Sequence, residues 1–166
     1  MSKENKILYH GSNSGGIKTF EPKQHIVGKD KKIVFATDDR NYALAMTYGT
    51  GDELAVSYAV SSSSGKKEIY VDELQPGKLK LLDKPGYLYE VEARHFEPSS
   101  EGLESEYVSY SAVPVLVETK IVNILEEFRK SPEVHLIVYE KVPQSMTERN
   151  KISGKPTIEH TRSRFL

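Results

Sequence analysis

The chain has 166 residues, which is enough for one domain with its own hydrophobic core and without disulfide or metal cross-links. Its 23 basic and 24 acidic side chains give a formal net charge of −1, so no overall field attracts nucleic acid or an anionic membrane. The absence of cysteine excludes disulfides, thiolate zinc sites and cysteine nucleophiles, and it fits a reducing compartment.

Targeting and membrane-spanning segments are not evident in the sequence. The polar N-terminus, MSKENK, predicts no signal peptide. No apolar run approaches the roughly 20 residues that are needed to cross a bilayer. We therefore expect a soluble, cytoplasmic protein without a membrane partner.

The first third of the chain alternates short apolar runs with polar turns. Residues 5–10 predict a strand, and GSNSGG after them predicts a flexible connector. The β-branched and aromatic run KIVFAT, residues 32–37, predicts a second strand. The following DDRNYALAMTYG predicts a helix, because its two aspartates suit the positive N-terminal end of a helix dipole and its final glycine is a common helix stop. Residues 52–60 alternate as a strand does, but their alanines suit a helix, and we favour the helix.

The rest of the chain is expected to consist mainly of strands. Residues 78–82 and 87–93 flank a Pro-Gly turn and predict a hairpin. Residues 107–122 contain two strand-like runs that are separated at Pro114. A short helix, ILEEFRKS, and a closing strand, HLIVYEKV, follow.

The order of these elements predicts the fold class. Many short strands, few helices and no regular strand–helix alternation indicate an α+β fold, in one domain over residues 1–143. Beyond it the apolar periodicity is lost and Lys and Arg outnumber Asp and Glu. Residues 144–166 are therefore expected to form a polar, basic tail that is extended or disordered.

Several familiar cofactor motifs are missing from the sequence. The segment GTGDEL has Leu54 where the third glycine of a dinucleotide-binding fingerprint belongs. The sequence contains neither a Walker-type loop nor a Gly-x-Ser-x-Gly elbow. Its five histidines do not have metal-ligand spacing, so we expect no metal site.

Three short segments carry patterns that are typical of one enzyme group. LYHGS (8–12) ends a strand in His-Gly-Ser, KIVFATDDRNYA (32–43) sets a tyrosine after a strand, and SEYVSY (105–110) contains Glu-Tyr-apolar-x-Tyr. In this order they resemble the three motifs of the ADP-ribosyltransferases of the poly(ADP-ribose) polymerase and diphtheria-toxin type. The segments YLYEVEARHFEP and YSAVPVLVETKIV are also similar in pattern to the small rifamycin ADP-ribosyltransferases.

The resemblance implies a fold of two packed, mostly antiparallel small sheets with a few helices. It also implies an enzyme that cleaves the nicotinamide–ribose bond of NAD and transfers ADP-ribose. The transition state of that reaction carries positive charge on the sugar, as in glycoside hydrolysis. The resemblance assigns Glu106 as the catalytic carboxylate that stabilises this charge. Glu104, in the same acidic run, is the competing carboxylate.

The resemblance further assigns residues to NAD, which is a substrate in this reaction. His10 would bind the nicotinamide ribose and thereby share in catalysis. Gly11 would offer its backbone to the carboxamide, and Ser12 would add a hydroxyl bond to the same amide. Tyr42 would stack on the nicotinamide ring. Arg40 would pair with the pyrophosphate.

The sequence departs from the family pattern at two places, which keeps alternatives open. Val34 stands where the family usually has an aromatic residue, and residues 38–41 lack a serine that is often present. One alternative is therefore a module that binds NAD or ADP-ribose without transfer. Another is an NAD-dependent RNA 2′-phosphotransferase, although KILYHGSNS lacks the arginines of that enzyme.

The acceptor of ADP-ribose and the oligomeric state are not predicted by the sequence. A protein, a nucleic acid and a small molecule are all possible acceptors. The loops at residues 13–31 and 95–105 are expected to select among them.

Overall fold

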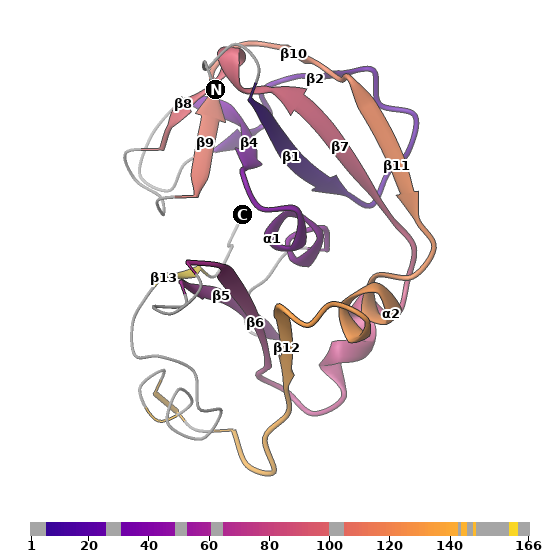
Figure 1. Ribbon diagram of the computed structural model, residues 1–166, viewed down its shortest axis with the longest axis vertical. Coiled ribbons are helices and arrows are strands. Elements are labelled where there is room, and N and C mark those ends of the chain that lie inside the picture. The colour runs from indigo at the N-terminus through magenta and orange to yellow at the C-terminus, as the bar shows by residue number, and fades with distance from the viewer. Residues whose placement is uncertain are drawn as a thin grey trace. The chain divides into compact units, whose positions relative to one another are not determined.

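The computed structural model describes residues 6–25, 31–48, 53–60, 65–99, 105–142, 144–145, 148 and 160–162 (Figure 1). These residues form two compact units, each built from separate stretches of chain. The first unit comprises Met1–Thr47 and Pro85–Val122, and the second comprises Tyr48–Lys84 and Asn123–Phe165. The predicted α+β class is confirmed, with mostly antiparallel sheets and few helices. The single domain expected over residues 1–143 stays a prediction.

The first unit is built on a seven-stranded antiparallel sheet. Its strands are β1 (Ile7–Ser12), β3 (Gln24–His25), β4 (Lys32–Thr37), β7 (Gly86–Glu92), β8 (Glu97–Pro98), β9 (Glu106–Ser109) and β11 (Val117–Ile121). The spatial order is β11-β7-β1-β4-β9-β8, and β3 pairs with β4. The predicted strand at 32–37 is confirmed. The first strand continues through Ser12, which pairs with Tyr87, so the start of GSNSGG is strand and not connector.

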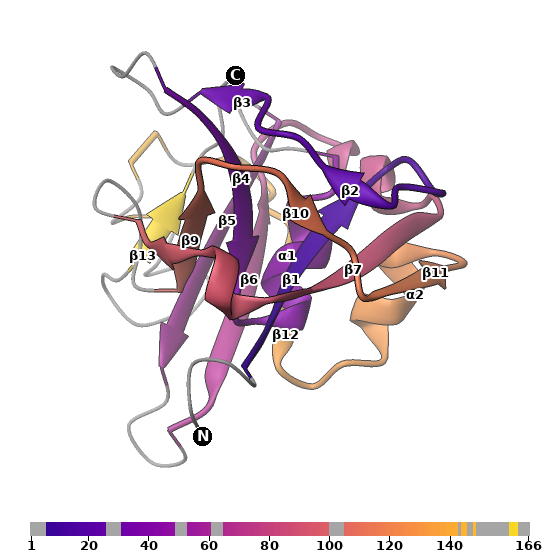
Figure 2. The ribbon, with the colours of Figure 1, turned by 90° about the horizontal axis from the view of Figure 1, so that it is seen from above.

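The two faces of this sheet are covered by different elements (Figures 1 and 2). Helix α1 (Arg40–Ala45) packs on one face, where it contacts β1, β4 and β7. The short paired strands β2 (Thr19–Phe20) and β10 (Val113–Pro114) contribute to the core on the other face. The fully packed members of that core are Leu8, Phe20, Val34, Ala36, Tyr89, Val91, Ala93, Phe96 and Val113.

Helix α1 begins where the sequence predicts it. The side chain of Asp39 accepts a hydrogen bond from the backbone N–H of Tyr42 at 2.8 Å and caps the helix. Four consecutive residues, Tyr42 to Ala45, are buried, so the helix is enclosed on nearly all sides.

The second unit contains a four-stranded sheet with the order β12-β6-β5-β13. Its strands are β5 (Leu54–Val60), β6 (Lys67–Glu73), β12 (Val134–Ile137) and β13 (His160–Arg162). Strand β12 is parallel to β6, whereas the other pairs are antiparallel. The predicted helix at 124–131 is confirmed as α2 (Ile124–Arg129). The strand expected over residues 135–142 is confirmed only in its first part, because β12 ends at Ile137, and β13 follows it in the chain.

Two expectations from the sequence are wrong. The helix expected over residues 52–60 is not formed, because Leu54–Val60 pairs along its whole length with β6 as strand β5. The hairpin expected around Pro85-Gly86 has only one strand, β7. Residues Lys78–Leu82 form a 3-10 helix, η2, directly after Gly77, whose left-handed φ of 79° is one that glycine adopts without strain.

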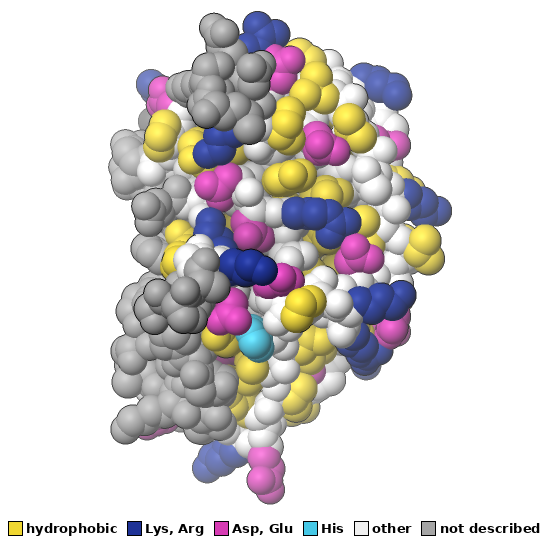
Figure 3. Space-filling model, in the orientation of Figure 1, with side chains coloured by type: hydrophobic (Ala, Val, Ile, Leu, Met, Phe, Trp, Pro, Cys, Tyr) yellow, Lys and Arg dark blue, Asp and Glu magenta, His cyan; other side chains and the backbone are white. Residues whose placement is uncertain are grey.

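The surface of the described residues carries mixed charge. Figure 3 shows acidic and basic side chains intermixed on the face that it draws, in keeping with the net charge near zero. None of the helices in the described ranges is long and apolar enough to span a membrane.

Candidate functional site

The structure brings Tyr42 and Glu106 into direct contact inside the first unit. The Tyr42 hydroxyl donates a hydrogen bond to Oε1 of Glu106 at 3.1 Å. Tyr42 is 0% exposed and Glu106 is 1% exposed. A phenol and a carboxylate from the second and third sequence motifs therefore meet in the interior.

The strand β4 sets the position of both residues. Its last residue, Thr37, pairs in register with Glu106 at the start of β9. The Thr37 hydroxyl also accepts a hydrogen bond from the backbone N–H of Asp39 at 3.2 Å, at the turn into α1. Because β4 leads directly into the helix, the phenol of Tyr42 is held over the neighbouring strand.

Gly11 is in close contact with helix α1. A Cβ atom at this position would lie 2.1 Å from the carbonyl oxygen of Ala43 and 2.5 Å from Oγ1 of Thr47. Distances this short are not tolerated, so only glycine fits here while the helix is in place. The open approach to the Gly11 backbone that the resemblance assigns to a ligand is thus filled by the helix.

His10 lies on the opposite face of the sheet from Gly11, Tyr42 and Glu106. Adjacent residues of a strand point to opposite faces, and the ring of His10 lies 4.4 Å from the ring of Phe20 on β2. Its Nδ1 donates a hydrogen bond to the carbonyl oxygen of Phe35 at 2.6 Å, since a carbonyl can only accept. In this conformation the structure does not bring His10 together with the Tyr42–Glu106 pair.

Polar side chains on the two strands beyond His10 form a hydrogen-bonded network on the same face of the sheet. His10 pairs in register with Tyr89 on β7, and Tyr89 pairs with Glu118 on β11. Oε1 of Glu118 lies 2.7 Å from the Tyr89 hydroxyl and accepts a hydrogen bond from the backbone N–H of Gly16 at 2.5 Å. The same hydroxyl lies 2.8 Å from the carbonyl oxygen of Ser14. Tyr89 and Glu118 therefore fasten the loop that follows β1 to the sheet.

The network shifts the titration of both side chains. Burial, reinforced by the hydrogen bond to Glu118, raises the pKa of Tyr89 to about 12. The hydrogen bonds from Tyr89 and from the Gly16 N–H lower the pKa of Glu118 below its usual value of 4.5. Neither residue is among those expected from the sequence, because Glu118 in VETKIV has the pattern of an exposed strand residue.

The remaining predicted site residues are spread around the helix and the strand ends. Ser12 ends β1, and its hydroxyl accepts a hydrogen bond from the backbone N–H of Ser14 at 3.1 Å. Arg40 is the first residue of α1 and is half-buried. Glu104, the competing carboxylate, lies outside the described residues.

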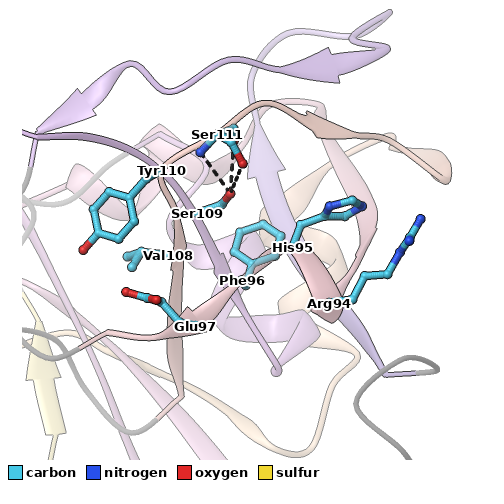
Figure 4. A pocket seen from close by; sticks show the side chains of 8 residues that line it. All are labelled: Arg94, His95, Phe96, Glu97, Val108, Ser109, Tyr110 and Ser111. Atoms are coloured by element: carbon cyan, nitrogen blue, oxygen red, sulfur yellow. Dashed lines mark hydrogen bonds between the residues drawn. The ribbon is translucent and has the colours of Figure 1, made fainter.

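A shallow pocket of about 430 Å³ lies beside the far end of β9. It is lined by Arg94, His95, Phe96, Glu97, Val108, Ser109, Tyr110 and Ser111 (Figure 4). Phe96 and Val108 are almost fully buried and Tyr110 is exposed. The Ser109 hydroxyl donates to the Ser111 carbonyl at 3.0 Å and fixes the turn. The residues assigned to NAD do not line this pocket, although it begins two residues beyond Glu106.

The second unit has a buried carboxylate–phenol pair of its own. Asp72 on β6 is 0% exposed and accepts a hydrogen bond from the Tyr139 hydroxyl at 2.6 Å. The acidic residue inside the strand-like run IYVDEL could have indicated it. The described residues contain no group of three or more His, Asp or Glu side chains that is placed to hold a metal ion.

Comparisons of this chain with protein-family models, with curated proteins and with solved structures give no significant match.

Proposed function

We propose that the chain is an NAD-dependent mono-ADP-ribosyltransferase. The observation that carries the proposal is the buried hydrogen bond between Tyr42 and Glu106. It joins the tyrosine of the second motif to the glutamate of the third motif. The resemblance assigns these two residues to the nicotinamide ring and to the reacting ribose.

The proposed chemistry needs a carboxylate in a protected site. The bond from the ribose carbon to the nicotinamide nitrogen breaks, and its electron pair leaves with the nicotinamide. Positive charge grows on the ribose, and Glu106 stabilises it more strongly inside the protein than it would in water. A nucleophilic atom of the acceptor then forms the new bond to the ribose carbon and loses its proton.

In the proposed reaction NAD enters by displacing helix α1 from β1. The helix fills the space above the Gly11 backbone, and Tyr42 is fully buried. The conformation described here is then the closed form. Because His10 faces β2 in this form, its proposed contact with the ribose depends on a rearrangement at the end of β1.

The pocket beside β9 is our candidate for the acceptor site. Three of its lining residues, 95–97, fall in the segment 95–105 that is expected to select the acceptor. Its rim offers a guanidinium, an imidazole and a carboxylate, and Tyr110 adds an exposed aromatic ring. These groups suit an acceptor that combines polar atoms with a planar or apolar part.

A binding module without transfer activity is the second candidate. The departure from the family pattern at Val34 favours it, because the family usually has an aromatic residue at that position. Under this alternative, NAD or ADP-ribose would raise the melting temperature but no nicotinamide would be released.

The deciding experiment measures nicotinamide release from NAD by the full chain and its variants. We expect Glu106→Gln to lower the release rate about a hundredfold or more, as removal of a preorganised charge does. The amide oxygen of Gln can still accept the Tyr42 hydrogen bond, so the fold should be retained. Glu104→Gln is the matched control and should release nicotinamide at the wild-type rate.

Three outcomes would contradict the transferase proposal or its assignment of Glu106. The first is that the wild-type chain releases no nicotinamide, and the second is that Glu106→Gln releases it as fast as the wild type. The third is that only Glu104→Gln is inactive, which would move the catalytic role to that carboxylate.

A further inference from the structure

The strand β11 forms an open edge of the sheet in the first unit. In the described residues it pairs with β7 on one side only, and it ends the strand order (Figure 1). Residues 117–120 are all exposed, and only Ile121 at its end is buried. Open edges carry unpaired backbone N–H and C=O groups that can pair with another strand.

Apolar side chains mark both ends of this edge. Leu116 is 48% exposed, Val117 is 45% exposed and Val122 is 81% exposed. Among the described residues these are three of the six large hydrophobic side chains that are exposed. Such a concentration on one edge is more typical of a contact surface than of scattered surface residues.

The sequence of this edge is complementary to itself when it is read in the opposite direction. Residues 116–122 are Leu-Val-Glu-Thr-Lys-Ile-Val, with Thr119 at the centre. The residues one position from Thr119 are an acid, Glu118, and a base, Lys120. The residues two and three positions away on either side are all apolar. An antiparallel pair of such strands would match every side chain with a suitable partner.

We propose that the chain forms a two-fold symmetric dimer in which β11 pairs with β11 of a second copy. In this register Thr119 faces Thr119 of the second copy, and Glu118 faces Lys120. Val117 faces Ile121, and Leu116 faces Val122. The two sheets join into one continuous antiparallel sheet across the symmetry axis.

Charge fixes the register of this pairing. A shift of the axis to residue 118 would oppose two glutamates, and a shift to residue 120 would oppose two lysines. Like charges that face each other across strands are destabilising. In the register centred on Thr119, both Glu–Lys pairs are attractive. The hydrogen bonds of Glu118 within its own chain use Oε1, and the cross-strand lysine can approach Oε2.

The contact closes on itself and is small. Each copy has one β11, so the pairing ends at two copies and does not extend into a fibre. A contact of the five residues of β11, with one flanking residue at each end, is smaller than a standard biological interface. We therefore expect a monomer–dimer equilibrium that depends on protein concentration.

The test places charge at the residue on the symmetry axis. Thr119→Asp opposes two carboxylates in the dimer, and Thr119→Lys opposes two ammonium groups. Each variant alone should dissociate at concentrations about tenfold higher than the wild type does. An equimolar mixture of the two should associate again as a heterodimer, because Asp then faces Lys. Sedimentation velocity over a wide concentration range measures all three samples.

Lys80→Glu is the control for a change of charge, since Lys80 is exposed on η2 in the second unit. It should dimerise as the wild type does, and circular dichroism should show each variant folded. A wild type that stays monomeric at every concentration would overturn the proposal. So would a mixture that stays as dissociated as its two components, or Thr119 variants that dimerise like the wild type.

Discussion

The Tyr42 hydroxyl and the Glu106 carboxylate share a hydrogen bond of 3.1 Å although they are 64 positions apart in the chain. The bond links helix α1 to strand β9 across β4, and neither side chain is accessible to water. A buried carboxylate that loses a hydrogen-bond donor keeps its desolvation cost. The contact therefore stabilises the first unit as well as joining two sequence motifs.

Removal of the hydroxyl should destabilise the protein. We expect Tyr42→Phe to lower the free energy of unfolding by about 1–3 kcal/mol, the usual cost when a buried acceptor loses its donor. Glu106→Gln should cost less, because its amide oxygen can accept the same hydrogen bond. Urea denaturation of both variants measures the difference. Equal stability of Tyr42→Phe and the wild type would show that the bond is not formed in solution.

The contact of Gly11 with helix α1 gives a second prediction. Gly11→Ala inserts a methyl group where only 2.1 Å separates it from the Ala43 carbonyl oxygen. The helix must shift, and overpacking of this kind costs about 1–3 kcal/mol. Ser12→Ala, one residue further along β1, is the control and should change stability by much less. Thermal denaturation gives the melting temperature of each variant. If Gly11→Ala has the same melting temperature as Ser12→Ala, α1 does not pack on β1 as described.

The sequence predicted those elements whose signals lie within a few residues. Strand β4 has a β-branched run and was found at its bounds, and α1 has its cap at Asp39 and was found at its start. The helix ends at Ala45, four residues before the glycine that was expected to end it. Strand β5 was mistaken for a helix because its assignment depends on β6, which pairs with it over its whole length. Strand β6 follows a serine-rich loop and was not predicted at all. Pairing between distant segments decides such cases, and local propensity cannot.

The structure brings together only some of the residues that the resemblance assigns to one site. It named Tyr42 and Glu106, which the structure joins. It also placed His10 and Gly11 at one ligand, but neighbours on a strand point to opposite faces of the sheet. Only Gly11 faces α1, and His10 faces Phe20. Alternation along β1 is visible in the sequence, whereas the element that covers each face is set by the tertiary fold.

The hydrogen bond between Glu118 and the backbone of Gly16, which holds the loop after β1 to the sheet, should depend on pH. The pKa of Glu118 is lower in the folded protein than its usual value of 4.5. The ionised carboxylate therefore contributes fully to stability above pH 4.5, and this contribution is lost as the pH falls through the pKa of the folded protein. The amide proton of Gly16, which Glu118 binds, should then become unprotected. Amide exchange at Gly16, followed by NMR as the pH is lowered, measures this. In Glu118→Gln the dependence should vanish, and a wild type without it would contradict the assignment.

The same network makes a prediction at high pH. The pKa of Tyr89 is about 12 in the folded protein, against an ordinary value of 10.0. The protonated phenol therefore contributes fully to stability below pH 10, and this contribution is lost as the pH rises through about 12. Ultraviolet absorbance should therefore show a late-ionising component in the wild type, to which Tyr89 contributes beside Tyr70, whose pKa is also raised by burial. Tyr89→Phe should remove the Tyr89 part of this component and leave the ionisation of the other tyrosines unchanged. A difference spectrum without a late component would show that Tyr89 is not held by Glu118.

The pocket beside β9 should affect transfer to the acceptor without affecting cleavage of NAD. Tyr110 is exposed at its rim, and Arg94 lies at the opposite end of its lining, so neither supports the buried Tyr42–Glu106 pair. We expect Tyr110→Ala and Arg94→Ala to release nicotinamide at the wild-type rate but to label fewer proteins or small molecules with ADP-ribose. Mass spectrometry of a cell lysate incubated with labelled NAD measures the transfer. Lys80→Glu serves as the surface control and should leave both quantities unchanged. If the two pocket variants transfer ADP-ribose as the wild type does, the acceptor binds elsewhere, and if they also stop nicotinamide release, the pocket serves NAD itself.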